Sequence, residues 1–192
     1  MQRVGFATGK RLEAQGMCGF VGFVGNEEPE KKKDIINEMM ELIAHRGPDS
    51  SGDYTDERAA LGFRRLSIIG LTNGTQPMYN EDGSLVLVFN GEIYNYKELK
   101  EELIKAGHTF RTDADTEVLV HGYEEYGKTL VKRLRGMYAF AIWDKAEDKL
   151  FAARDMFGIK PFYYYKREDA FLFGSEIKGF LPHPSFKKEL NE

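Results

Sequence analysis

The sequence predicts an α+β fold in which two stacked sheets, mostly antiparallel, are flanked by helices. Three observations lead to this prediction. Apolar runs such as 85–89 are typical of strands covered on both faces. Segments with apolar residues at helical spacing fall into two groups, near residues 29–43 and 96–126. Short, aromatic-rich stretches separated by turn residues then follow between 137 and 173. No linker composition interrupts the chain after Cys18, so we expect one domain there.

The first third of the chain should form a strand, a helix and two further strands. Residues 18–25 predict a buried strand that ends at a Gly-Asn turn. A helix should begin at Pro29 and end at the Gly-Pro pair of residues 47–48. Strands are expected at Ser50–Thr55 and Ala59–Ile69, the second of which contains two consecutive arginines. Because side chains alternate along a strand, one of these arginines should face a cleft or the core.

The remaining elements are predicted from the same signals. A polar loop spans 73–82, and the strand at 85–89 should run into a sharp polar turn at 90–95. An amphipathic helix at 96–106 should be closed by Gly107, and Thr112 or Asp113 could cap the next helix. The final elements are expected at 130–134 (helical), 137–143, 150–154, 162–165 and 171–173 (strands), and 175–181 (helical).

Composition excludes several classes of function. The net charge is −4 and the pI about 5.7, which argues against nucleic acid or an anionic membrane as the main partner. No apolar run approaches the roughly 18 residues of a membrane span. A single cysteine cannot form an internal disulfide, and this fits a reducing cytoplasm. No metal site is expected, because the histidines lack metal-ligand spacing; they are His45, His108, His121 and His183.

Cys18 is the candidate nucleophile. If the chain began at this residue, its thiol and a free α-amine would share one residue, with reference pKa values of roughly 8.5 and 7.7–8.0. The amine could then act as the general base for the thiol, without help from a histidine. The alternative is that Cys18 is a small buried hydrophobe in an apolar strand.

Three further segments could complete a site for an α-amino acid amide. Asn90 and Gly91 could donate a side-chain and a backbone N–H to an oxyanion, or could simply form a tight turn. Arg65 could bind a carboxylate, or could form a structural ion pair with Asp49 or Asp155. Asp115 could accept an ammonium group, or could belong to a carboxylate-rich helix start.

Seven ordered motifs give the chain a family resemblance. They are Cys18-Gly19-Phe20-Val21-Gly22, His45-Arg46-Gly47-Pro48-Asp49, Arg65-Leu66-Ser67-Ile68, Gln76-Pro77-Met78, Asn90-Gly91-Glu92-Ile93-Tyr94-Asn95, Asp115-Thr116-Glu117, and Arg154-Asp155 through Gly158-Ile159-Lys160-Pro161. From Cys18 to about Leu181 the chain resembles the class II glutamine amidotransferase domain of glutamine-dependent asparagine synthetases. Hexosamine-phosphate synthases and phosphoribosyl amidotransferases share the Cys-Gly start but resemble this chain less at the second and third motifs.

The resemblance implies a fold and a set of roles. The fold would be the αββα sandwich of the N-terminal-nucleophile hydrolases. Cys18 matches the nucleophile and its α-amine the base, while Asn90 and Gly91 match the oxyanion hole. Arg65 matches the residue that binds the glutamine α-carboxylate, and Glu92 and Asp115 match residues around the α-amino group. The implied reaction is hydrolysis of L-glutamine through a γ-glutamyl thioester, with no metal or organic cofactor.

Two departures from the family pattern qualify this expectation. The chain ends at Glu192 without the ATP- and Mg-dependent synthetase domain, so we expect ammonia to pass to such a domain or subunit elsewhere. Residues 1–17 precede the nucleophile and are expected to be a leader, propeptide or added extension in front of an amidotransferase domain at 18–192. If they stay attached, the alternative is a catalytically silent module that binds glutamine or docks onto a partner. A homodimer is a further expectation.

Overall fold

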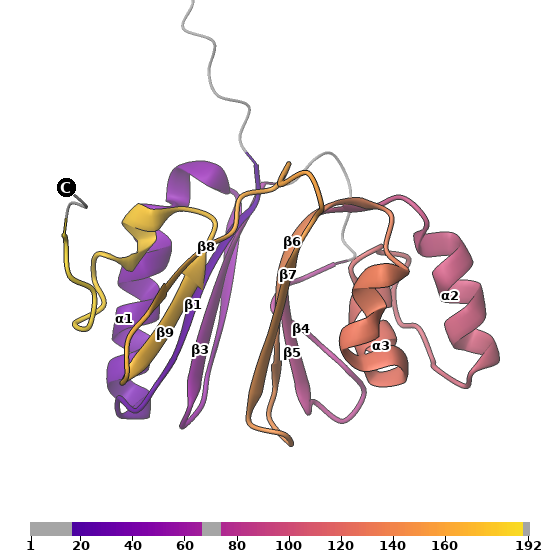
Figure 1. Cartoon of the computed structure of the whole chain (residues 1–192), viewed down its shortest axis with the longest axis horizontal. Helices are drawn as coiled ribbons and strands as arrows, with labels where there is room; N and C mark the ends of the chain where they lie inside the picture. Colours follow the sequence, from indigo (N-terminus) through magenta and orange to yellow (C-terminus); the bar gives the residue numbers. More distant parts are fainter. Residues whose placement is uncertain (1–16, 67–73, 190–192) are drawn as a thin grey trace, which may run out of the picture.

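A computed structural model describes residues 17–66 and 74–189, and it contains two sheets that face each other between helical layers. Figure 1 shows α1 on the outer face of one sheet, with α2 and α3 on the outer face of the other. The predicted α+β sandwich of two stacked antiparallel sheets flanked by helices is confirmed. The predicted leader, apart from Met17, lies outside the described residues, as does the end of the strand predicted at Ala59–Ile69.

The first sheet has five strands in the order β2-β3-β1-β9-β8. Their bounds are β1 Gly19–Gly25, β2 Ser50–Thr55, β3 Ala59–Arg65, β8 Tyr163–Lys166 and β9 Ala170–Gly174. All neighbours in this sheet are antiparallel, and Gly19 of β1 is paired with Arg64 of β3. Continuing this register by one residue places Cys18 beside Arg65 at the same end of the sheet.

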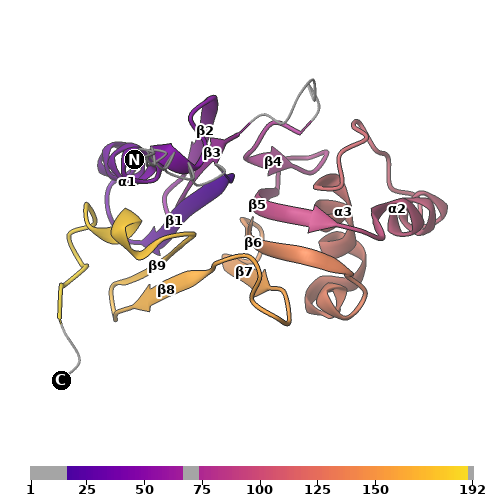
Figure 2. The same cartoon turned by 90° about the horizontal axis from the view of Figure 1, so that it is seen from above.

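The second sheet has four strands in the order β4-β5-β6-β7. Their bounds are β4 Met78–Tyr79, β5 Leu85–Ile93, β6 Gly136–Asp144 and β7 Lys149–Arg154. The view from above in Figure 2 shows β5 and β6 as the long central strands of this sheet, with α3 close by. Their antiparallel pairing runs without interruption from Leu85↔Asp144 to Ile93↔Gly136.

The helices cover the two outer faces. The α-helices are α1 Pro29–Leu42, α2 Tyr96–Lys105 and α3 Glu117–Tyr126, and short 3-10 turns occupy Ala44–Arg46, Gly127–Lys132 and Ile177–Phe180. Helix α1 packs its apolar stripe on the first sheet, and α2 and α3 bury theirs on the second. None of the helices formed by the described residues combines the length and apolar character that a bilayer crossing requires.

The layer between the sheets is apolar and fully buried. It is formed by side chains from both sheets, including Phe20, Leu61, Phe63, Val86, Val88, Ala141, Trp143 and Phe173. Polar contacts also join the two sheets at the end of β3 that lies away from Arg65, where Arg58 Nε lies 3.4 Å from Asp148 Oδ1. There the indole nitrogen Nε1 of Trp143 donates to Asp56 Oδ2 at 2.8 Å.

Four details differ from the sequence prediction. Helix α1 ends at Leu42, and the separate 3-10 turn Ala44–Arg46 lies before the Gly-Pro pair where the helix was expected to end. Strand β5 continues through Asn90 and Gly91 to Ile93, where a turn was expected, because β6 pairs with it along its whole length. Neither Thr112 nor Asp113 caps α3, which starts at Glu117. Instead, the Glu117 carboxylate accepts hydrogen bonds from the backbone nitrogens of Arg111 and Thr112 at 2.7 and 2.8 Å. The short strand β4 was predicted as loop.

Candidate active site

A cavity of about 560 Å³ lies where the two sheets meet, at the start of β1 and the ends of β3 and β5. All the site residues named from the sequence line it, together with neighbours from both sheets. The predicted residues are Cys18, Arg65, Asn90, Gly91, Glu92 and Asp115. Strands and loops far apart in the chain therefore bring the thiol, the guanidinium, the carboxylates and the carboxamide of these six residues to a single cavity.

Cys18 lies immediately before β1 at the wall of this cavity and is partly exposed. Its Sγ is held by the backbone of Leu66, which follows β3. The Leu66 nitrogen donates to Sγ at 3.4 Å, and the Leu66 carbonyl oxygen lies 3.7 Å from it. Cys18 packs against the apolar layer between the sheets but is only partly buried and lines the cavity, which argues against the purely structural alternative.

Arg46 fixes the backbone of Cys18. Its Nε and Nη2 donate to the Cys18 carbonyl oxygen at 3.2 and 3.1 Å, and its Nη1 donates to Glu176 Oε1 at 3.1 Å. Burial alone would raise the pKa of the Glu176 carboxyl, but hydrogen bonds from His45 and Arg46 bring that pKa below its usual value. An ionised Glu176 therefore keeps the Arg46 fork in place.

Asn90 and Gly91 lie side by side on β5. Asn90 is 3% exposed, and its Nδ2 has no hydrogen-bond partner among residues 17–66 and 74–189. A buried amide donor without a partner costs free energy, and this donor belongs to a cavity-lining side chain. Gly91 is needed because a Cβ there would lie 2.1 Å from the Met137 carbonyl oxygen of β6, and its φ is +154°. These features agree with two donors available to a bound oxyanion.

Glu92 and Asp115 bring negative charge to the same cavity. Asp115 Oδ2 accepts a hydrogen bond from the Ile93 nitrogen at 2.8 Å, which ties the segment before α3 to the end of β5. Burial and the neighbouring Glu92 raise the pKa of the Asp115 carboxyl above its usual value, despite that hydrogen bond. A cationic group bound here would favour the ionised Asp115 carboxylate and so oppose the effects of burial and of Glu92.

The two consecutive arginines of β3 diverge, as the strand alternation predicted. Arg65 lines the cavity, whereas Arg64 Nε donates to the Met40 carbonyl oxygen and its guanidinium pairs with Glu41 on α1. The Asp155 carboxylate, one of the alternative partners for Arg65, accepts hydrogen bonds from the backbone nitrogens of Tyr138, Ile159 and Lys160.

Sequence reasoning assigned no role to three residues that shape this site. Arg46 holds the Cys18 carbonyl, Gln76 pairs with Phe89 through its side-chain amide, and Lys160 lies at the cavity wall near Met17. All three belong to motifs that supported the family resemblance. Their presence in those motifs was the available signal, but contacts between segments so distant in the chain could not be derived from it.

Comparisons with known proteins agree with this geometry. The profile described as "Glutamine amidotransferase domain" matches residues 17–192. Asparagine synthetase [glutamine-hydrolyzing] 1 of Bacillus subtilis (strain 168) is 50% identical over 169 residues, covering 86% of this chain and 27% of that protein. Asparagine synthetase [glutamine-hydrolyzing] 2 of the same strain is 45% identical over 178 residues, covering 91% and 24%. The chain thus spans about a quarter of the length of these curated relatives.

Solved structures support the fold. The glutamine phosphoribosylpyrophosphate amidotransferase from B. subtilis complexed with ADP and GMP superposes with a TM-score of 0.69 at 26% identity, covering 85% of this chain and 43% of that one. A structure titled as the allosteric regulatory enzyme of purine biosynthesis gives a TM-score of 0.71 at 26% identity, covering 86% and 43%. This chain therefore belongs to the glutamine amidotransferase domain family, in its class II form with the N-terminal-nucleophile hydrolase fold.

Proposed function

We propose that this chain hydrolyses L-glutamine to glutamate and ammonia, with Cys18 as the nucleophile. The observation that carries the proposal is the single cavity lined by a thiol, an unpartnered carboxamide donor, an arginine and a pair of carboxylates. These groups match, one for one, the amide carbon, the developing oxyanion, the α-carboxylate and the α-ammonium of glutamine. The residue roles named from the sequence are part of this proposal.

The reaction would begin with transfer of the Cys18 thiol proton to its own α-amine. The thiolate attacks the side-chain amide carbon of glutamine, and the resulting oxyanion accepts hydrogen bonds from Asn90 Nδ2 and the Gly91 nitrogen. The protonated α-amine of Cys18 then gives this proton to the leaving nitrogen. Ammonia departs, and a γ-glutamyl thioester remains on Cys18. Water then attacks the thioester, the thiol is restored, and glutamate is released.

Arg65 and Asp115 would orient the substrate. The planar guanidinium of Arg65 suits a bidentate contact with the α-carboxylate. Asp115 and Glu92 would receive the α-ammonium, which restores the ionised form of a carboxyl whose pKa burial has raised. Nucleophile and base come from one residue, so we propose that this half-reaction needs no metal ion or organic cofactor.

The acceptor of the ammonia is a second part of the proposal. Both Bacillus relatives carry names that specify asparagine synthesis with glutamine hydrolysis, and this chain spans about a quarter of each. We propose that it serves a synthetase domain or subunit of that kind. The predicted cytoplasmic location, homodimer and leader boundary remain predictions.

Protein that begins at Cys18 tests the proposal directly. It should release ammonia and glutamate in equal amounts from glutamine, and rapid quenching should trap a glutamyl adduct on the Cys18 peptide. Cys18→Ala should abolish both, and full activity in that variant would refute the nucleophile. Protein that retains residues 1–17 has an amide in place of the α-amine and should be nearly inactive. If the Cys18-initiated protein binds glutamine in calorimetry but releases no ammonia, the silent binding module replaces the present proposal.

A further inference from the structure

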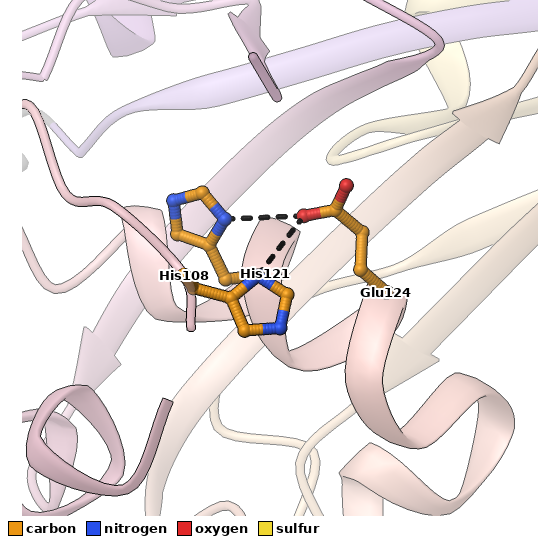
Figure 3. Close-up of side chains that lie close together, drawn as sticks. All are labelled: His108, His121 and Glu124. Atoms are coloured by element: carbon orange, nitrogen blue, oxygen red, sulfur yellow. Dashed lines mark hydrogen bonds and ion pairs between the residues drawn. The ribbon is translucent and has the colours of Figure 1, made fainter. Parts of the chain in front are cut away.

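Two histidines and a glutamate converge outside the glutamine cavity, on the outer side of the second sheet. Spacing along the chain gave no indication of a metal site, but the fold brings His108, His121 and Glu124 together with one ligand atom from each within 4.8 Å of the others. Figure 3 shows both imidazoles directed at the same carboxylate. Glu124 Oε2 lies 3.1 Å from His121 Nδ1 and 3.7 Å from His108 Nδ1.

We propose that His108, His121 and Glu124 form a Zn²⁺ site. Zinc bound at about 2.0–2.1 Å in tetrahedral geometry separates its ligand atoms by about 3.3 Å. The separations of Glu124 Oε2 from the two Nδ1 atoms, 3.1 and 3.7 Å, lie on either side of that value. Glu81 offers a fourth ligand, since its Oε2 is 3.7 Å from His121 Nδ1. Two imidazoles with carboxylate oxygens form a donor set that suits zinc better than magnesium or calcium.

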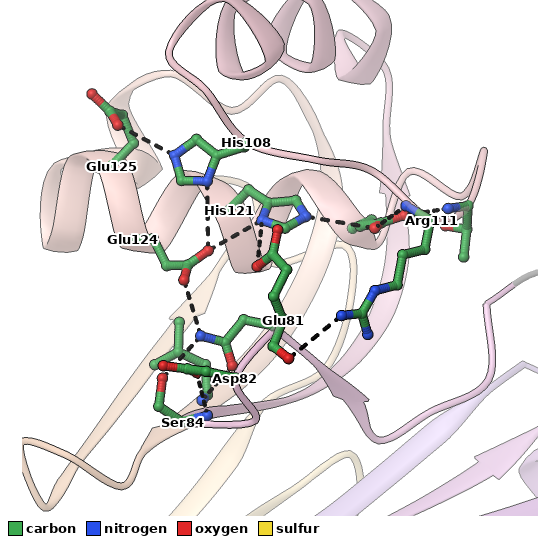
Figure 4. Close-up of polar contacts among 12 residues, drawn as sticks. Glu81, Asp82, Ser84, His108, Arg111, His121, Glu124 and Glu125 are labelled. Atoms are coloured by element: carbon green, nitrogen blue, oxygen red, sulfur yellow. Dashed lines mark hydrogen bonds and ion pairs between the residues drawn. The ribbon is translucent and has the colours of Figure 1, made fainter.

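The second ring nitrogen of each histidine supports the proposal. His108 Nε2 lies 3.2 Å from Glu125 Oε2 (Figure 4). His121 Nε2 lies 3.5 Å from Glu117 Oε1. Histidines that bind metals commonly present the other ring N–H to a carboxylate, which fixes the tautomer and the ring orientation. His108 has that arrangement, whereas His121 Nε2 faces the Glu117 carboxylate without a hydrogen bond to it. The Nδ1 atom of each ring is directed at the proposed ion (Figure 3).

The surroundings of the two rings also suit a bound cation. The carboxylates of Glu81, Glu117, Glu124 and Glu125 lie around the two histidines, and His121 is almost entirely buried. In this arrangement His121 Nε2 has no hydrogen-bond partner among the described residues. A divalent cation at the Nδ1 atoms would leave a proton on each Nε2.

Glu124 is held in the orientation that the site requires. Its Oε1 accepts a hydrogen bond from the buried Asn80 Nδ2 at 2.9 Å, so Oε2 remains directed at the histidines. The cluster joins the loop after β4, the loop after α2, and α3 itself. Helix α3 begins two residues after Asp115, so zinc would hold in place the segment that carries a cavity residue.

Zinc affinity, measured by calorimetry on the untagged, metal-free chain, tests the site. All proteins should carry Cys18→Ser, so that the thiol does not bind the added ZnCl₂. One Zn²⁺ per chain should bind, and the midpoint of thermal unfolding should rise by about 5–10 °C at a free zinc concentration near one hundred times Kd. X-ray absorption should show nitrogen and oxygen ligands at about 2.0–2.1 Å.

Variants separate the proposed ligands from their neighbours. His108→Gln and Glu124→Gln should each weaken zinc binding more than a hundredfold, and Glu125→Gln by about 10–100-fold, as expected for an outer partner. The surface changes Glu147→Gln and His45→Gln should leave the affinity unchanged. Absence of binding, or binding that persists unchanged in both His108→Gln and Glu124→Gln, would show that the cluster is an ion-pair network only.

Discussion

Arg46 holds the backbone carbonyl of Cys18 in a two-pronged grip, with Nε at 3.2 Å and Nη2 at 3.1 Å. The contact links the 3-10 turn after α1 to the residue that begins the first sheet. It involves only the carbonyl oxygen of Cys18, whereas the thiol contacts the backbone of Leu66. Arg46 is therefore a positioning residue for the proposed nucleophile, held in turn by Glu176.

If Arg46 positions Cys18, its replacement should lower the rate of glutamine hydrolysis. Arg46→Lys supplies a single ammonium where a planar fork was present, so Cys18 should lose its fixed direction. We expect kcat for ammonia release to fall by at least about tenfold while KM for glutamine changes little. Arg64→Lys is the matched control, since Arg64 contacts α1 and lies outside the cavity. Equal losses of kcat in the two variants would contradict the role of Arg46.

Asn90→Ala should lower turnover without weakening the fold. Its Nδ2 donates to no described residue, so truncation breaks no hydrogen bond from that atom. Loss of one oxyanion donor typically lowers kcat by about 10²–10³-fold, which corresponds to about 2.7–4 kcal/mol of barrier. Steady-state kinetics together with thermal melts would check both halves of this prediction. A normal kcat would remove Asn90 from the oxyanion hole.

Arg65→Ala should act mainly on substrate binding. An ionic contact with the α-carboxylate is present in both the ground state and the transition state, so KM should rise by about 10–100-fold while kcat is largely retained. Glutaramate, which lacks the α-ammonium but keeps the carboxylate, should lose affinity in the variant to a similar extent. If KM for glutamine is unchanged, Arg65 does not bind the carboxylate.

Asp115→Asn should raise stability at neutral pH while it impairs glutamine binding. Because burial raises the pKa of Asp115 in the folded state, that state binds more protons than the unfolded chain between the ordinary and the raised carboxyl pKa. The contribution of this carboxyl to the free energy of unfolding therefore falls as pH rises through that window, and the loss persists above it. Asparagine removes the titration and keeps an acceptor oxygen for the Ile93 nitrogen.

Urea unfolding of the Asp115→Asn variant and the parent chain across pH measures this effect. The two proteins should be similarly stable in acid, and the variant should become relatively more stable as pH increases. The KM for glutamine should rise in the variant at the same time. A variant that is less stable than the parent at neutral pH would show that the charged carboxylate is favourable in the fold.

Local signals predicted most of the strands and helices but not the features that depend on distant pairing. The start of α1 at Pro29, the bounds of β2 and the Gly107 end of α2 follow from turn and cap chemistry. The turn expected at Asn90-Gly91 was wrong because β6 pairs with β5 beyond Gly91, and that pairing outweighs the turn preference of the dipeptide.

The candidate site shows the same division. Its residues could be named from motifs, but their common cavity depends on how the two stacked sheets face each other at one end. The cluster of His108, His121 and Glu124 could not be anticipated, because His108 lies in the loop between α2 and α3 whereas His121 and Glu124 lie on α3. Contacts that depend on how helices settle on a sheet have no periodic signature in sequence.

The apolar layer between the sheets has a consequence for activity, because Cys18 and Arg65 belong to one wall and Asn90 and Gly91 to the other. A small shift of one sheet relative to the other would misalign Cys18 Sγ and Asn90 Nδ2 without disrupting the hydrogen bonds within either sheet. A substitution that leaves a cavity beside Trp143 should therefore lower the catalytic rate under conditions in which the protein is still folded. The catalytic rate therefore reports how tightly the two sheets pack against each other.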